Sequence, residues 1–245
     1  MKAIIMAAGI GTRLKKKFGN MPKCLTDIGG ETIVRRMVRL LHERGIKDIS
    51  LVLGYQDHLV RAHLGSRWKV HYYSNPFFSI TNSICSLWFA RNELDGQQDA
   101  IILNGDLFFE PGLLEQVMSA KEDAVMFADP RRVEEGDYRF AYTDGLLRRY
   151  GKDLPAEMAN GEYVGIAKLD RGTVAAFRTR LEQLIALQQF GLWWEDALYR
   201  LSADGMPIHI HEITEHFWAE LDYLEDYERT QQFLKSSAEK AANAA

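Results

Sequence analysis

The chain has 245 residues, of which 47% are apolar and 26% are charged, and its formal net charge is −4. This length and composition indicate one globular α/β domain, or one domain that carries a large insertion. The mild charge and the scattered basic residues give no electrostatic reason to expect nucleic acid or an anionic membrane as a partner.

The N-terminal apolar run, residues 1–9, is too short for a signal peptide and reaches a glycine before it could span a bilayer. The two cysteines, Cys24 and Cys85, lie far apart and in no CxxC spacing. This spacing argues against a disulfide framework or a structural zinc site and favours two buried thiols. We therefore expect a cytoplasmic protein.

Short apolar runs alternate with segments of helical period in the first half of the chain. The segment Thr32–Arg44 has apolar residues on one face and arginines on the other, which predicts the crossover helix of a βαβ unit. We therefore expect an α/β fold with a Rossmann-like, doubly wound mixed sheet, in which ligands bind beyond the carboxyl ends of the strands. The predicted buried parallel strands are Ala3–Met6, Ile49–Leu53, Val70–Tyr73, Ala100–Leu103 and Ala124–Ala128.

The pattern changes after Asp129, where charged turns become frequent. We interpret residues 129–206 as a lobe inserted into a core made of residues 1–128 and 207–235, so that residues 1–235 form a single domain. We expect the small and polar residues 236–245 to be a frayed helix end or a flexible tail. The later predicted elements are a hairpin at Asp144-Gly145, a strand over Glu162–Lys168, a helix over Gly172–Gln189, a returning segment over Pro207–Ile213 and a helix from Leu224.

The first predicted strand is followed by small residues and then by basic residues. Small residues let backbone N–H groups approach a polyphosphate, and Arg13 and Lys23 add positive charge. Leu14 stands where a dinucleotide fingerprint requires a third glycine, and the Gly-Lys-Ser/Thr of a P-loop is absent. The opening therefore predicts a polyphosphate site of another kind. Its two parts read Ala7-Ala8-Gly9-Ile10-Gly11-Thr12-Arg13 and Pro22-Lys23-Cys24-Leu25.

Two acidic segments far apart in the chain are candidate ligands of Mg²⁺. Gly105-Asp106 follows a predicted buried strand, and Trp218-Ala219-Glu220-Leu221-Asp222 precedes the last helix. Magnesium prefers one or two carboxylates together with phosphate oxygens and water. Taken singly, Asp106 would be a turn or cap residue and Asp222 a helix N-cap; together with the opening motif they predict a metal site.

The opening resembles the AAGxGxR and PKxL signature of the nucleotide-diphospho-sugar transferase-like nucleotidyltransferases, and Asp106 and Asp222 match the family's GD and ExD metal positions. The resemblance implies that fold and a magnesium-dependent transfer of a nucleoside monophosphate with release of pyrophosphate. It assigns Arg13 to the leaving pyrophosphate and Lys23 to the α-phosphate. A phosphate or phosphonate acceptor is already nucleophilic, so that no general base is required. The expected nucleotide-binding residues are Ala7, Ala8, Gly9, Gly11, Thr12, Asn82, Ser83 and Gly105.

The segment Asn75–Trp88 looks most like the LicC-type choline-phosphate cytidylyltransferases and the related phosphonate cytidylyltransferases, which favours CTP. Asn82 and Ser83 are the candidates for contact with the base. The alternative is that Thr81 or Asn82 caps a helix.

Aromatic residues beside carboxylates suggest an acceptor that carries an ammonium group, because both attract a cation. The alternative is that Trp193 or Trp194 packs the lobe against the sheet. Glu162 departs from the choline-type pattern and fits the phosphonate branch better, so we expect an acceptor of the phosphocholine or 2-aminoethylphosphonate type. The expected acceptor-binding residues are Glu162, Trp194, Glu195 and Asp196.

Other interpretations remain open at this point. His209 and His211 share one face of a predicted strand, where two solvent-facing histidines are more common than a metal site. The chain would otherwise be a sugar- or polyol-phosphate nucleotidyltransferase that uses another nucleoside triphosphate, or a non-catalytic nucleotide-binding protein. In the preferred interpretation its partners are small molecules, CTP and a phosphorylated or phosphonate acceptor.

Overall fold

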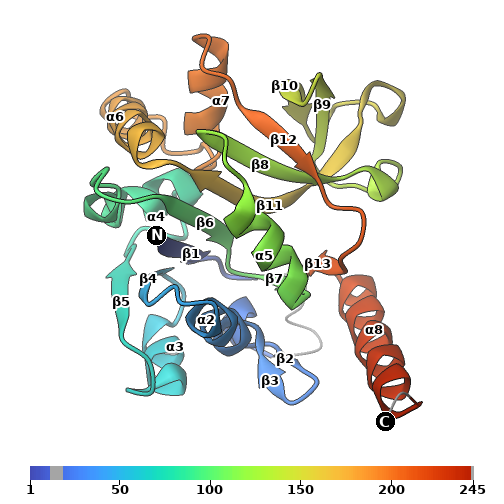
Figure 1. Cartoon of the computed structure of the whole chain (residues 1–245). Helices are drawn as coiled ribbons and strands as arrows, with labels where there is room; N and C mark the ends of the chain where they lie inside the picture. Colours follow the sequence, from blue (N-terminus) through green and yellow to red (C-terminus); the bar gives the residue numbers. More distant parts are fainter. Residues whose placement is uncertain (12–18, 244–245) are drawn as a thin grey trace.

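The computed structural model of the chain describes residues 1–11 and 19–243. Its described part contains a mixed sheet in the order β5-β4-β1-β6-β11-β8-β12-β10-β9 (Figure 1). The four strands β5, β4, β1 and β6 run parallel, as predicted, whereas β11 runs antiparallel to both of its neighbours in the sheet. The strands are β1 (Lys2–Ala7), β4 (Asp48–Leu53), β5 (Val70–Ser74), β6 (Ala100–Asn104), β8 (Ala124–Asp129), β9 (Arg139–Thr143), β10 (Leu146–Gly151), β11 (Gly161–Leu169) and β12 (His209–Glu212).

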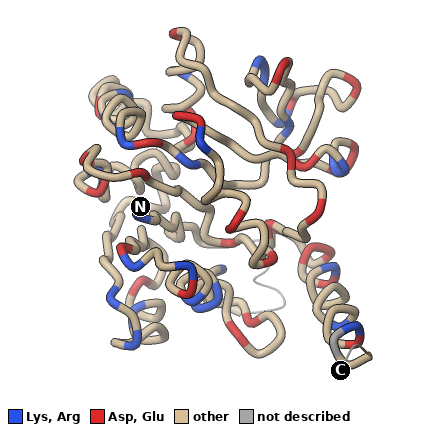
Figure 2. Tube along the Cα trace, viewed as in Figure 1, with Lys and Arg blue, Asp and Glu red and all other residues tan. Residues whose placement is uncertain are grey.

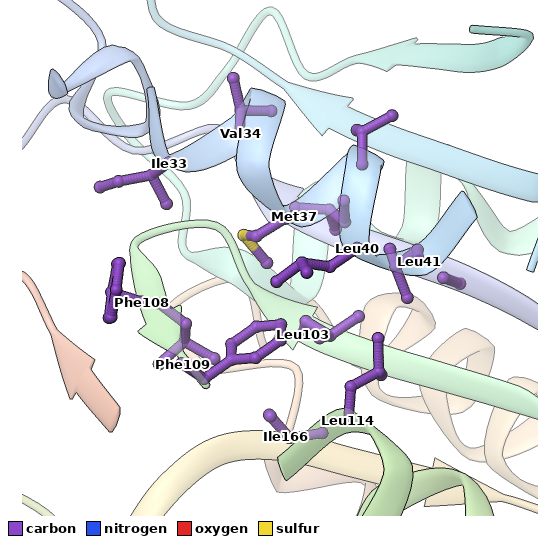
Figure 3. Close-up of a cluster of buried hydrophobic side chains, with 14 of the residues drawn as sticks. Ile33, Val34, Met37, Leu40, Leu41, Leu103, Phe108, Phe109, Leu114 and Ile166 are labelled. Atoms are coloured by element: carbon purple, nitrogen blue, oxygen red, sulfur yellow. The ribbon is translucent and has the colours of Figure 1, made fainter. Parts of the chain in front are cut away.

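Helices cover both faces of this sheet because successive side chains of each strand point to opposite faces. Ile5 of β1 packs in a cluster with α2, α3 and α5, and Ile4 packs in a second cluster with α4, α6 and α7. Figure 3 shows Met37 and Leu40 of α2 beside Leu103 of β6 in the first cluster. The doubly wound arrangement is therefore confirmed. The helices are α2 (Ile33–Glu43), α3 (Asp57–Leu64), α4 (Ser83–Phe89), α5 (Pro111–Ser119), α6 (Arg171–Ala186), α7 (Asp196–Ala203) and α8 (Leu224–Asn243).

Strand β11 lies inside the central sheet, between β6 and β8. The sequence pattern predicts that its residues belong to a lobe inserted over residues 129–206. Every residue of β11 is buried, so its apolar run requires a neighbouring strand on each edge and a helix layer on its face. Strand β11 is therefore part of the core sheet, although it falls within residues 129–206.

One further prediction differs from the structure at the edge of the sheet. Strand β5 is parallel as predicted, but it is the edge strand and is only partly buried. Helix α8 continues through residues 236–243, the segment for which a frayed helix end or a flexible tail is predicted. The predicted hairpin at Asp144-Gly145 is confirmed, with both residues at positive φ between β9 and β10.

Short elements complete the described chain. Strands β2 (Asp27–Ile28) and β3 (Glu31–Thr32) form one small sheet, and β7 (Leu107–Phe109) and β13 (Trp218–Glu220) form another. The 3₁₀ helices are Lys23–Leu25, Arg91–Glu93, Pro130–Arg132 and Ala156–Met158.

The two cysteines are free and buried, as predicted. Basic and acidic residues are interspersed along the trace (Figure 2). Among the described residues, no helix combines the length and the apolar character that crossing a membrane requires.

Candidate active site

A cavity of about 320 Å³ lies beyond the carboxyl ends of β1 and β6. Met6, Ala8 and Gly9 line it from the end of β1, and Asn104 and Asp106 line it from the end of β6. A second cavity of about 260 Å³ shares Met6, Gly9 and Asp106 with the first. The site thus lies where parallel strands of a doubly wound sheet are expected to bind ligands.

Asp106 and Asp222, which are far apart in the sequence, line both cavities. Strands β7 and β13 bring them together, because β7 begins directly after Asp106 and pairs antiparallel with β13, which ends two residues before Asp222. The backbone N–H of Leu221 then donates to the carbonyl oxygen of Asp106 at 3.0 Å. The predicted convergence of the two carboxylates is therefore present.

Lys23 lies between these two carboxylates. Its Nζ is 2.6 Å from Oδ2 of Asp106 and also donates to Oδ1 of Asp222. Burial opposes the charged ammonium, but Asp106 and Asp222 outweigh burial and raise the pKa of Lys23 above its usual value. Gly11 has φ +64°, and a Cβ there would lie 2.8 Å from Cβ of Lys23, so the first loop can approach the lysine only with glycine at this position.

The donor set fits a magnesium ion. Oδ1 of Asp106 is buried and has no hydrogen-bond partner among the described residues, which leaves one carboxylate oxygen available to a cation. Burial, followed by the neighbouring carboxylate of Asp106, raises the pKa of Glu220 well above its ordinary value. No group of three His, Cys, Asp or Glu side chains in the described part of the chain is arranged to hold a metal by itself, so phosphate oxygens and water would complete the coordination of the ion. We call Lys23, Asp106, Glu220 and Asp222 the carboxylate cluster.

Gly105 has a structural reason for being glycine. A Cβ at this position would lie 2.6 Å from the carbonyl oxygen of Met6 and 2.7 Å from Cβ of Ala7. Glycine therefore lets the turn after β6 pack on the end of β1, which places Asp106 in the cavity. Gly105 lines the smaller cavity with the predicted nucleotide-binding residues Ala7, Gly9 and Gly11.

Asn82 caps helix α4 and also lines the larger cavity. Its side chain accepts from the backbone N–H of Ser83 at 2.8 Å, and its Nδ2 donates to the carbonyl oxygen of Gly191 at 3.1 Å. Ser83, which also lines the cavity, accepts at Oγ from the backbone N–H of Trp194 at 2.9 Å. The helix cap and the lining of the cavity, which the sequence analysis treated as alternatives for Asn82, are present together.

A group of aromatic residues around a buried carboxyl forms another part of the larger cavity. Glu195 is buried there, and burial raises its pKa to about 8. Tyr138 contacts the ring of Trp193 edge-on, with centroids 5.3 Å apart, and stacks on Tyr199. We call Tyr138, Tyr163, Trp193, Glu195 and Tyr199, all of which line the cavity, the aromatic cluster.

The two tryptophans differ in position. Trp194 is 1% exposed, lies outside the lining of both cavities and donates from Nε1 to Oδ1 of Asn104 at 3.0 Å. Trp193 is 36% exposed and lines the larger cavity. Trp194 therefore packs inside the protein, which was the alternative left open for it. Trp193, rather than Trp194, lies at the cavity where an acceptor-binding tryptophan was predicted.

Glu162 and Asp196 support the site from outside the lining of both cavities. Glu162 accepts from Nε of Arg132 at 2.6 Å and from the backbone N–H of Asp137 at 3.1 Å, and so holds the loop before β9. Asp196 accepts from the backbone N–H of Trp193 at 2.8 Å. Both residues thus position cavity-lining residues.

Other predicted residues lie elsewhere. Thr12 and Arg13 are outside the described residues. His211 pairs with Glu122 at 3.1 Å, on a strand of alternating burial. This arrangement agrees with solvent-facing histidines.

Several residues that line the cavity were not identified from the sequence. Asn104 directly precedes Gly105-Asp106, so its place at a strand end is a signal that could have been used. Tyr163 and Trp193 each adjoin a residue that was singled out. Asp137, Tyr138 and Lys152 belong to the hairpin region and carry no local signal; tertiary folding alone brings them to the cavity.

The fold and this site define a class of nucleoside triphosphate transferases. The chain belongs to the family described as the MobA-like NTP transferase domain, whose model matches residues 3–239.

Several characterised proteins resemble the chain. A CMP-5'-(3-aminopropyl)phosphonate synthase of Streptomyces rubellomurinus is 36% identical over 157 residues, which are 62% of this chain and 25% of that protein. A CTP:phosphoglutamine cytidylyltransferase of Campylobacter jejuni is 26% identical over a match that covers 69% of this chain and 72% of that protein. A choline-phosphate cytidylyltransferase of Streptococcus pneumoniae is 23% identical over a match that covers 96% of this chain and 99% of that protein. The match thus spans a quarter of the length of the first relative and nearly all of the third.

Solved structures show the same fold. The CTP:phosphocholine cytidylyltransferase LicC from Streptococcus pneumoniae matches with a TM-score of 0.76 at 18% identity, over 95% of this chain and 98% of that one. The inositol-1-phosphate CTP transferase from T. maritima gives the same TM-score and identity over 94% of both chains. The predicted nucleotide-diphospho-sugar transferase type of fold is confirmed.

Proposed function

We propose that the protein is a magnesium-dependent cytidylyltransferase, which transfers CMP from CTP to a small phosphorylated or phosphonate acceptor bearing an ammonium group and releases pyrophosphate. The observation that carries the proposal is that one cavity is lined both by the three carboxyl groups of the carboxylate cluster and by the aromatic cluster, while Lys23 lines the adjoining smaller cavity. The first suits a nucleoside triphosphate with its metal ion, and the second suits an organic cation. The names of the relatives support both CTP and acceptors of this class.

The chemistry requires position and charge more than proton transfer. An oxygen of the acceptor's phosphate or phosphonate attacks the α-phosphorus of CTP, and the bond from that phosphorus to the oxygen of the leaving pyrophosphate breaks. Lys23 places an ammonium at the boundary of the two cavities, where it would stabilise charge on the α-phosphate oxygens. Asp106 and Asp222 would hold the magnesium ion, which supplies further positive charge to the phosphates when bound.

The small residues at the end of β1 would let the chain approach the nucleotide closely. Ala8, Gly9, Asn82 and Ser83 line the larger cavity, and Ala7, Gly11 and Gly105 line the smaller one. We assign the base to the side of Asn82 and Ser83 and the phosphates to the side of Gly11 and Lys23. The acceptor would then occupy the aromatic cluster, where Trp193 offers the aromatic face that an ammonium group prefers.

The first experiment is pyrophosphate release, with the common nucleoside triphosphates crossed against acceptors. The acceptors are phosphocholine, phosphoethanolamine, 2-aminoethylphosphonate, inositol phosphate and glucose 1-phosphate. Turnover that requires CTP, Mg²⁺ and an amine-bearing acceptor supports the proposal, and EDTA should abolish that turnover. Preferred turnover with a sugar or polyol phosphate, or binding of nucleotide without any turnover, would contradict it.

A further inference from the structure

Lys152 and Asp137 form an ion pair in the lining of the larger cavity. Asp137 precedes β9 and Lys152 follows β10, so both come from the hairpin region beside the aromatic cluster. Nζ of Lys152 is 2.6 Å from Oδ2 of Asp137 and lies 5.5 Å from the centroid of the Trp193 ring. A cation of the protein itself therefore lies against the aromatic face that would attract the acceptor's ammonium.

This pair can be opened by a ligand at little cost. The side chains of Lys152 and Asp137 are 40% and 48% exposed, and ion pairs of such exposure contribute about 0–1 kcal/mol to stability. Trp193, by contrast, is held in place by Tyr138 and by the hydrogen bond from its backbone N–H to Asp196. The Trp193 ring is therefore already in place, and Lys152 and Asp137 beside it can pair with a ligand instead of with each other.

The charges on the acceptor decide whether this exchange is favourable. An acceptor with an ammonium group alone would take over Asp137 and Trp193 and would leave the Lys152 ammonium beside a like charge. An acceptor that carries a carboxylate next to its ammonium would replace one ion pair by two: its ammonium with Asp137, and its carboxylate with Lys152. One cation beside one anion is the pattern complementary to a zwitterion.

We propose, on the basis of the proposed function, that the acceptor is the phosphate ester or the phosphonate of an amino acid. Lys152 then binds the carboxylate that distinguishes such an acceptor from a simple amine. Lys152 is then a specificity residue of the acceptor site.

Two pairs of acceptors differ by this carboxylate alone and test the inference. They are O-phosphoserine against phosphoethanolamine, and 2-amino-3-phosphonopropanoate against 2-aminoethylphosphonate. We expect the wild-type enzyme, with CTP and Mg²⁺, to have the higher kcat/KM for the carboxylate-bearing member of each pair. We expect Lys152→Met to lower that preference about tenfold or more, mainly through KM, because a charge-assisted hydrogen bond is lost.

Three further variants separate binding from a structural role. Lys152→Arg should keep the preference within about threefold, because a guanidinium also pairs with carboxylates. Asp137→Asn should lower kcat/KM for both members of a pair, because both carry the ammonium, and should leave their ratio in place. Lys47→Met removes an exposed lysine in another part of the chain. It should change neither kcat/KM for the acceptors nor the ratio between the two members of a pair.

Failure of this inference can be told apart from failure of the proposed function. The role of Lys152 would be overturned if the wild-type enzyme turned over CTP but preferred the simple amines. It would also be overturned if Lys152→Met lowered kcat/KM equally for both acceptors of a pair. Absence of CTP turnover with every amine-bearing acceptor would remove the proposed function as well.

Discussion

The carboxyl groups of the carboxylate cluster line the same cavity as the aromatic cluster, but the two clusters are stabilised in different ways. In the first, the ammonium of Lys23 faces Asp106, Glu220 and Asp222 among the described residues, so that three carboxyl groups are held close together. In the second, rings contact rings, as Tyr138 contacts Trp193 and Tyr199. In the proposed function the carboxylate cluster receives a metal ion and a polyphosphate, whereas the rings of the aromatic cluster already contact one another.

Loss of a carboxylate tests this difference most strongly. We expect Asp106→Asn and Asp222→Asn each to lower kcat by about 10²–10³-fold or more, because an amide cannot supply the charge that a metal ion on the phosphates requires. Pyrophosphate release measures the loss, and circular dichroism should show an unchanged fold. Asp144→Asn, in an exposed turn at φ 52°, is the matched control. Normal turnover in both cavity variants would refute the role of the carboxylate cluster.

Trp194 provides the corresponding test of packing. Because Trp194 is 1% exposed and donates to Asn104, we expect Trp194→Ala to lower the free energy of unfolding by about 3–5 kcal/mol. Trp193→Ala, at an adjacent site that is 36% exposed, should cost less than about 1 kcal/mol. Urea unfolding compares the two variants, and equal losses would mean that their positions have been misassigned.

Glu195 makes stability depend on pH. Burial raises its pKa from the ordinary value of 4.5 to about 8, so between these values the folded protein holds a proton that the unfolded chain has released. The free energy of unfolding should therefore fall as the pH rises from about 4.5 to about 8, by about 2–4 kcal/mol from this group. Glu195→Gln should remove that part of the slope, as measured by urea unfolding at several pH values. An identical slope in the variant would show that the carboxyl is ionised in the folded protein.

Lys23 gives a smaller effect that is specific to the carboxylate cluster. Lys23→Met removes the ammonium that pairs with Asp106 and Asp222. We expect the free energy of unfolding to fall by about 2 kcal/mol, below the usual cost of breaking a buried ion pair, because the side chain of Asp222 is 28% exposed. Added Mg²⁺ should restore more stability to the variant than it adds to the wild-type protein, because the ammonium no longer competes with the ion. Thermal unfolding with MgCl₂ and with CaCl₂ measures this. A smaller response in the variant would argue against a metal site at these carboxylates.

Lys23, Asp106 and Asp222 could be predicted from the sequence because each stands in a local motif, and Asp106 also follows the end of β6. Glu220 was not predicted as a site residue, although it stands in the same acidic segment as Asp222. The aromatic cluster was harder to predict. Trp193 and Trp194 are adjacent and equally aromatic, and which one faces the cavity depends on how the loop before α7 packs. The place of β11 was also not evident, because an apolar run of strand length fits the core and a peripheral lobe equally well. Asp137 and Lys152 become relevant only through tertiary contacts.

The place of β11 in the sheet limits how acceptor preference can be transplanted between relatives. Because β11 is the neighbour of both β6 and β8, exchanging residues 129–206 as one cassette would replace the middle of the sheet and put the pairing of two native strands at risk. Two shorter exchanges leave β11 itself in place: residues 130–160, which include the hairpin of β9 and β10, and residues 187–195. They carry Asp137, Lys152, Trp193 and Glu195 between chains, so exchanging these two segments is the practical route to altering the proposed acceptor site on this scaffold.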